Sequence, residues 1–253
     1  NLNTQNTPKS TYHVETTGED SHQTWFELLK TQEISLEMHE KIISYCNEKK
    51  ILFLSTPYDI ESAKLLNKLK VPAFKIASTD TNNYPYLAEV ANLNKPMIIS
   101  TAMCNMEEVE LAVKTIKSEG LEELVVCQCT GNYPSRIEDS NLNVINQYKK
   151  DLDCLIGFSD HTLELINPIA AVGLGICVYE KHFTIDKNMD GPDHRMSLNP
   201  NELIETIKLM RLAEKAMGSK SKEVLGDELE NREKLRKSIV SKRQIEPNEI
   251  ISR

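Results

Sequence analysis

The chain has 253 residues, of which 40% are hydrophobic and 27% are charged, and its formal net charge is -8 at pH 7. This composition suits a soluble α/β protein with one large core. The acidic balance and the lack of a basic tract argue against nucleic acid as a partner, and the longest apolar run, residues 168–179, is too short to span a membrane.

We find no signal peptide at the start of the chain. The six cysteines lack the spacing of zinc ligands and mostly lie in apolar contexts; they are Cys46, Cys104, Cys127, Cys129, Cys154 and Cys177. We therefore expect reduced thiols in a cytoplasmic protein.

Both ends of the chain look cut. It starts at Asn1 and stops at Arg253, on residues that resemble an entering strand, so we expect a fragment. The polar residues 1–35 are predicted to form a long βα loop, and a helix is predicted to follow at 36–49.

Short apolar runs rich in β-branched residues recur along the chain. Their near-continuous hydrophobicity indicates strands that are buried on both faces. Six such strands are predicted, at residues 51–55, 73–77, 97–100, 124–129, 155–158 and 176–179.

Helical patterns separate these strands. Apolar residues at helical spacing occur at 60–69 and at 106–119, where Asn105 is a good N-cap. The segment 168–174 is also competent to form a helix, and a further helix at 201–217 ends at Gly218.

Alternating strands and helices predict a βα repeat. An open flavodoxin-like sheet would usually need only five strands, whereas a TIM (β/α)8 barrel needs eight strands and about 250 residues. We therefore predict an incomplete TIM barrel over residues 1–218, with about six βα units present and roughly 60 residues missing from its front.

The composition changes after Gly218. Residues 219–237 are strongly charged and are predicted to form a helix and a linker. A strand pattern returns at 238–241, so residues 238–253 are predicted to open a second, smaller domain.

Two strings place histidines where strands give way to loops. GFSDHT occupies residues 157–162 and EKHFTID occupies residues 180–186. Because both strands run the same way, His161 and His182 are expected to converge at one edge of the sheet, as half of a metal site. The alternative is that each is a hydrogen-bonded structural residue. Likewise, Asp160 and Glu180 either orient the imidazoles or are structural.

Hydroxyl groups occur at nearly every strand tip. Together with Lys75 they predict an anion site, because a phosphate or carboxylate needs several donors at once. The alternative is that serine and threonine simply end strands and cap helices. These residues include Thr56, Ser78, Thr130 and Ser159.

Taken together and in this order, several strings resemble the N-acetylneuraminate (sialic acid) synthase family. They are STPYD at 55–59, KIAS at 75–78, SDH at 159–161, EKHFTID at 180–186 and GPDH at 191–194, and KSIVSK at 237–242 resembles the start of the family's antifreeze-like (SAF) domain. The resemblance runs from about Thr16 to the C-terminus.

The resemblance implies a TIM barrel that condenses phosphoenolpyruvate with an N-acyl hexosamine such as N-acetylmannosamine. The products would be a nine-carbon 2-keto sugar acid and phosphate. It further implies that the catalytic residues are His161, His182 and Asp193, and that His161 and His182 hold a divalent metal, Mn²⁺ or else Mg²⁺ or Co²⁺. Phosphoenolpyruvate would be bound by Thr56, Lys75, Ser78, Thr130 and Ser159. The sugar would be bound by Asp80, Tyr133 and Asp193.

The chain also departs from the family pattern. A glutamate motif of the first strand and a lysine of the second are not in it, Thr16 stands where some members have Asn, and Asp80 stands where many have Glu. Three alternatives stay open: a legionaminic acid synthase, a pseudaminic acid synthase, or an inactive fragment that only binds. In the family the full-length protein is a domain-swapped homodimer.

Overall fold

The computed structural model describes residues 12–14, 19–21, 30, 33–191 and 193–251. The chain divides into two compact units, Asn1–Ala216 and Met217–Arg253. Thr16 and most of the segment predicted as a long loop lie outside the described residues. Inside that segment, strands β1 (Tyr12–Val14) and β2 (Glu19–Ser21) pair antiparallel.

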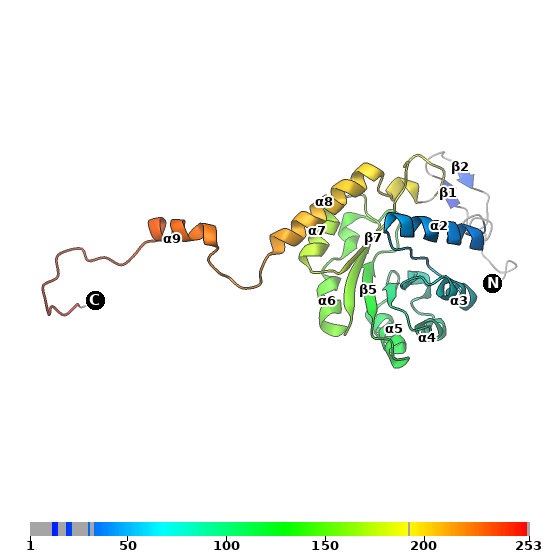
Figure 1. Cartoon of the computed structure of the whole chain (residues 1–253), viewed down its shortest axis with the longest axis horizontal. Coiled ribbons are helices and arrows are strands. Elements are labelled where there is room, and N and C mark those ends of the chain that lie inside the picture. Colours follow the sequence, from blue (N-terminus) through cyan, green and yellow to red (C-terminus); the bar gives the residue numbers. More distant parts are fainter. Residues whose placement is uncertain (1–11, 15–18, 22–29, 31–32, 192, 252–253) are drawn as a thin grey trace. The chain divides into compact units, whose positions relative to one another are not determined.

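The first unit is built on a parallel sheet in which each strand lies beside the next one along the chain (Figure 1). This order confirms the predicted βα repeat and gives a half-barrel of the TIM type. The five strands are β3 (Phe74–Ile76), β4 (Met97–Ser100), β5 (Leu124–Cys129), β6 (Leu155–Asp160) and β7 (Val178–Lys181).

Helices lie at all five predicted places, and two further helices that were not predicted, α4 and α6, also connect strands. Asn105 caps α5 as predicted: its side chain accepts from the backbone N–H of Glu108 at 3.0 Å, while the Glu108 carboxylate accepts from the N–H of Asn105 at 2.8 Å. The helices are α2 (Leu36–Lys49), α3 (Ile60–Lys68), α4 (Tyr84–Ala91), α5 (Met106–Ser118), α6 (Val144–Asp151), α7 (Ile166–Gly173) and α8 (Pro200–Met217), with the short 3₁₀ turns η1 (Ser78–Asp80), η2 (Ile137–Ser140) and η3 (His194–Met196).

The sheet has two chemically different faces. On one face, apolar side chains such as Phe74, Ile99 and Val126 are fully buried in the core that the sheet shares with the helices. On the other face the register places Cys129 beside Ser159 and Ser159 beside Glu180. Since side chains alternate along a strand, this second face, the inner face of the half-barrel, carries the polar groups.

Two of the predicted strands are corrected. Residues 51–55 form no strand, and Ile51 and Leu52 are exposed, so the sheet has five strands and not six. Apolar character alone does not make a strand, because a strand also needs a hydrogen-bonded neighbour, and this segment has none among the described residues.

The last strand begins at Val178, two residues later than predicted. Ile176 is used to end α7 instead: its N–H donates to the carbonyl of Ala171 at 3.3 Å, with Gly175 at a positive φ of 75°.

The second unit contains η4 (Gly226–Glu228) and α9 (Leu229–Leu235). The strand predicted at 238–241 is wrong: the segment is irregular, and Ile239 and Val240 are exposed. It has no neighbouring strand among the described residues to pair with. The assignment of 219–237 as a linker and of 238–253 as the start of an antifreeze-like domain stays a prediction.

Within the part of the chain that the structure describes, no helix combines the length and the apolar character needed to cross a membrane.

Gly157 in the middle of β6 provides a test of this packing. A Cβ atom at this position would lie 2.6 Å from Cys127 Sγ and 3.0 Å from the carbonyl oxygen of Val178. We expect Gly157→Ala to lower the free energy of unfolding by about 1–3 kcal/mol, because the two neighbouring strands must move apart. Urea unfolding followed by circular dichroism measures this change.

Gly226→Ala is the matched control, because nothing lies within 4 Å of a Cβ placed there. Equal stability of the Gly157→Ala variant and the wild type would show that β5, β6 and β7 are not packed as described.

Candidate active site

His161 and His182 each follow directly after a strand end, His161 after β6 and His182 after β7. Their ring centroids are 5.3 Å apart, and the ring planes make an angle of 67°. The structure therefore brings the two predicted histidines together at the carboxyl edge of the sheet, where α/β barrels carry their active sites.

Neighbouring groups and burial determine the protonation state of both imidazoles. The Nδ1–H of His161 donates to the carbonyl oxygen of Thr130 at 2.7 Å, which leaves its Nε2 with a free lone pair. Nδ1 of His182 lies 3.5 Å from a carboxylate oxygen of Asp193. Burial lowers the pKa of both histidines, against the opposing effect of hydrogen bonding at His161 and of Asp193 at His182. Both rings are therefore neutral at pH 7.

These two neutral rings fit a divalent cation. Metal binding requires a deprotonated nitrogen, and a bond from the other nitrogen of the ring fixes the tautomer. Among the residues that the structure describes, no group of three or more histidine, cysteine or acidic side chains is gathered as a metal site. A cation held by His161 and His182 would therefore complete its shell with water or substrate oxygens.

Two tyrosines complete this edge of the sheet. The ring of Tyr133 packs against His161, with 4.1 Å between centroids, and against His182, with 5.6 Å. Tyr58 was not predicted as a site residue. Burial raises its pKa, and the neighbouring carboxylates of Asp80, Asp193 and Glu180 raise it further. Tyr58 thus lies near Asp80 and Asp193, two of the residues predicted to bind the sugar. Its position two residues after Thr56 is the sequence feature that could have identified it.

Lys75 lies on the inner face of the half-barrel in a network of polar groups. Its Nζ donates to Ser100 Oγ at 2.8 Å and to the carbonyl of Ile76 at 3.0 Å, and it lies 3.5 Å from Glu180 Oε1. The same carboxylate oxygen accepts from Ser159 Oγ at 2.8 Å. One network therefore joins β3, β4, β6 and β7, and Ser100 is a member that the sequence did not single out.

The predicted hydroxyl groups differ in whether their protons are free. Ser78 Oγ accepts from the N–H of Ala102 at 3.0 Å, and its hydroxyl also hydrogen-bonds to the thiol of Cys129. The proton of Ser159 goes to Glu180, and that of Thr130 goes to the carbonyl of Asp139 at 2.7 Å. The side chain of Thr56 makes no hydrogen bond to the residues that the structure describes.

The acidic neighbours of the two histidines do not orient the imidazoles. Asp160 faces away from the site: one oxygen accepts from the N–H and hydroxyl of Thr162, and the other from Tyr179 at 3.0 Å. Asp160 therefore shapes the turn after β6, and Glu180 binds Ser159. Asp80 stands in η1, where its carboxylate accepts from Asn83 at 3.4 Å.

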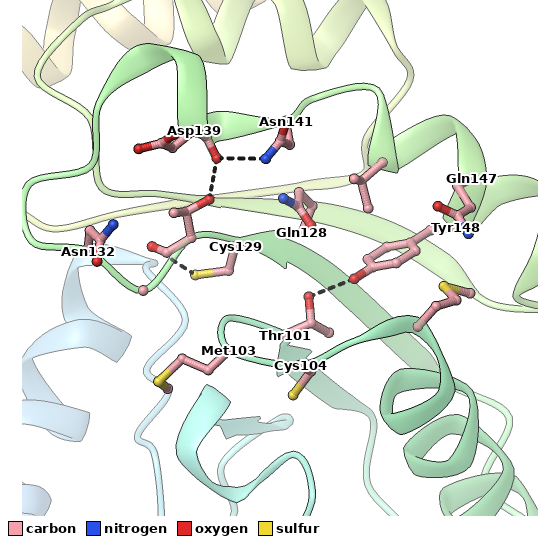
Figure 2. A pocket seen from close by; sticks show the side chains of 14 residues that line it. Thr101, Met103, Cys104, Gln128, Cys129, Asn132, Asp139, Asn141, Gln147 and Tyr148 are labelled. Atoms are coloured by element: carbon pink, nitrogen blue, oxygen red, sulfur yellow. Dashed lines mark hydrogen bonds between the residues drawn. The ribbon is translucent and has the colours of Figure 1, made fainter.

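A cavity of about 500 Å³ lies beside these residues, between the ends of β4 and β5 and helix α6 (Figure 2). Of the predicted site residues, only Thr130 lines it. No sequence pattern predicted this cavity, because its polar residues are scattered along the chain.

A parallel βα sheet whose carboxyl edge gathers two imidazoles and several hydroxyls places the chain in the α/β-barrel class of folds. A family model described as the NeuB family matches residues 1–222. The chain belongs to the NeuB family.

Characterised relatives and solved structures agree with this family. The chain is 40% identical to the N,N'-diacetyllegionaminic acid synthase of Campylobacter jejuni, over 96% of this chain and 73% of that protein. It is 40% identical to the N-acetylneuraminate-9-phosphate synthase of Mus musculus, over 84% of this chain and 59% of that protein.

The crystal structure of the N-acetylneuraminic acid synthetase of Leptospira borgpetersenii in complex with citrate matches with a TM-score of 0.78 at 29% identity. The match covers 83% of this chain and 75% of that one, and it supports the TIM-type fold. The chain spans part of the length of each of these proteins.

The buried, neutral histidines predict a stability that falls in acid. The pKa of His161 lies below its ordinary value of 6.5 in the folded chain. As the pH falls through about 6.5, the unfolded chain takes up a proton that the folded chain resists, so the free energy of unfolding decreases until the folded pKa is passed. His161→Gln should flatten this pH dependence, as measured by urea unfolding between about pH 7.5 and pH 5.

Proton NMR of the histidine Cε1 positions gives the pKa values directly. A value for His161 above 6.5 would contradict the neutral state that we assign to it.

Proposed function

We propose that this chain carries part of the catalytic barrel of a synthase that condenses phosphoenolpyruvate with an N-acyl hexosamine such as N-acetylmannosamine. The products are a nine-carbon 2-keto sugar acid and phosphate. The observation that carries the proposal is one edge of the sheet with two neutral imidazoles at 5.3 Å and, on the same inner face, Lys75 with its hydroxyl neighbours. Cation and anion sites side by side are what this reaction needs.

The proposed cation site consists of Nε2 of His161 and of His182. A divalent cation such as Mn²⁺, held there, would supply Lewis acidity toward the aldehyde of the open sugar. The hydrogen bond from His161 to Thr130 holds the imidazole in the tautomer that such a cation requires.

Lys75 is proposed to hold the anionic end of phosphoenolpyruvate, with Ser78 as a second donor. The Lys75 ammonium is now shared between Ser100, a backbone carbonyl and Glu180. An arriving phosphate therefore competes with the Glu180 carboxylate for this charge. Ser78 would turn its proton from the Cys129 thiol to the phosphate.

In the reaction, C3 of phosphoenolpyruvate forms a bond to the aldehyde carbon, water adds at C2, and the C2–O bond to phosphate breaks. The role of Lys75 and Ser78 is to hold the phosphate until it leaves. Asp80, Tyr133 and Asp193 are proposed to position the sugar, since carboxylates accept from its hydroxyls.

A second acceptor is supported by the likeness to a diacetyllegionaminic acid synthase, whose product carries two N-acetyl groups. Assays of the purified protein with N-acetylmannosamine and with a di-N-acetylated hexosamine, each with phosphoenolpyruvate and Mn²⁺, distinguish the two acceptors. If phosphate is released with neither of the two acceptors, the proposed function is contradicted.

The cation site is tested without the reaction. His161→Ala and His182→Ala should each weaken Mn²⁺ binding by tenfold or more, since each removes one of the two protein ligands. Titration calorimetry and electron paramagnetic resonance measure the binding. His39→Gln is the control, because His39 bonds to the backbone of Ser35 within the α2 region. Unchanged Mn²⁺ affinity in both alanine variants would refute the assignment.

The anion site is tested on Lys75. Lys75→Met keeps the length of the side chain and removes its charge, so phosphoenolpyruvate should bind more weakly by roughly 1.5–3 kcal/mol, while sugar binding stays nearly unchanged. Lys64→Met is the matched control, because Lys64 is an exposed residue of α3 paired with Glu61 at 3.3 Å. Equal phosphoenolpyruvate affinities of the Lys75→Met variant and the wild type would rule out this role.

A further inference from the structure

The cavity beside the candidate active site contains a buried amide that lacks partners. Gln128 is only 7% exposed, and it lines the cavity from β5 (Figure 2). Its Nε2 donates to the carbonyl of Ser140 at 3.2 Å. Its Oε1 and its second N–H make no hydrogen bond to the residues that the structure describes. Buried polar groups are rarely left unpaired, so this acceptor and donor point to a ligand or to water in the cavity.

A second acceptor comes from Tyr148, which is buried on α6. The hydroxyl proton of Thr101 goes to the carbonyl of Cys127 at 2.8 Å. The 3.0 Å bond between the two side chains is therefore donated by Tyr148 to Thr101. Burial raises the pKa of Tyr148, so it keeps this proton, and the remaining lone pairs of its oxygen can accept.

The cavity is electrically neutral. Its described lining residues include no lysine, arginine or histidine. The carboxylate among them, Asp139, has both oxygens bound by the guanidinium of Arg136, at 2.8 and 2.9 Å. The cavity therefore has no free charge with which to hold a phosphate or a carboxylate.

Part of the cavity wall is apolar. Met103, Met106 and Val144 line the cavity together with the polar groups. An amide that offers a donor and an acceptor side by side matches two adjacent hydroxyls, one donating and one accepting. The apolar wall matches the C–H face of the same molecule. A volume of about 500 Å³ lies within the range of small-molecule sites.

We propose that this cavity is a binding site for a neutral, hydroxyl-rich ligand of monosaccharide size, held through an adjacent pair of hydroxyls by Gln128. The cavity adjoins the histidine pair, because two of its lining residues, Cys129 and Thr130, also contact His161, but neither histidine lines it. The proposal does not depend on the synthase reaction.

Cys104 lines the cavity and reports on its occupancy. The thiol is partly exposed, and burial raises its pKa, so alkylation by iodoacetamide is slow but measurable in mild alkali. We expect D-mannose, used as the probe, to slow the alkylation of Cys104 severalfold in the intact chain, as measured by mass spectrometry of peptides. Cys154 and Cys177 lie outside the cavity and serve as references whose rates should not change.

Gln128→Met should weaken the protection of Cys104 by roughly tenfold or more, because two hydrogen bonds to the ligand are lost while the volume is kept. The matched control is Gln244→Met in the second unit, and it should retain the protection of Cys104 by mannose. The His182→Ala variant should retain this protection as well. Val144→Phe, which fills the cavity and keeps Gln128, should also abolish it. Phosphoenolpyruvate should give no protection.

Two outcomes would overturn the proposal. One is the absence of protection by mannose at its highest usable concentration, which leaves water as the occupant. The other is equal protection in wild type and Gln128→Met with a normal far-UV spectrum, which would show that the sugar binds elsewhere.

Discussion

The structure depends on the alternation of side chains along its parallel strands. Lateral pairing places Cys129, Ser159 and Glu180 in one row on the inner face, while Val126 and Phe158 point into the core. A slip of one residue in any strand would exchange these two sets and bury charge in the core. The apolar packing of Phe74, Ile99 and Val126 therefore determines the register, and the register determines which polar groups face the candidate site.

Charge at this inner face is balanced before any substrate arrives. Lys75 carries a partly buried positive charge, and Glu180 and the Ser100 hydroxyl compensate it. The two histidines need no compensating charge, because burial lowers their pKa and favours the neutral form. The site thus combines a charged group whose partner can be exchanged for an anion with neutral nitrogens that can accept a cation. The pairing of Lys75 with Glu180 and the neutral state of the histidines both result from the partial burial of these side chains.

Local sequence patterns predicted most of this arrangement. The strands at Met97–Ser100 and Leu124–Cys129, the cap at Asn105 and the placement of both histidines at strand ends depend on neighbouring residues only. Residues 51–55 were mispredicted because a strand requires a partner, which apolar composition does not reveal. The partners of individual hydroxyl groups were also beyond prediction: that Ser159 donates to Glu180 and that Ser78 accepts from Ala102 depends on contacts between distant strands.

Strand β5 separates two environments through consecutive residues. Gln128 lines the neutral cavity, whereas Cys129 and Thr130, at and directly after the end of the strand, line the cavity and also contact His161. The carbonyl of Thr130 accepts from His161, and its hydroxyl donates to the carbonyl of Asp139 at the cavity wall. These two hydrogen bonds form a continuous connection from η2 to the imidazole. The tautomer of His161 therefore depends on the position of Thr130, which the cavity wall holds in place.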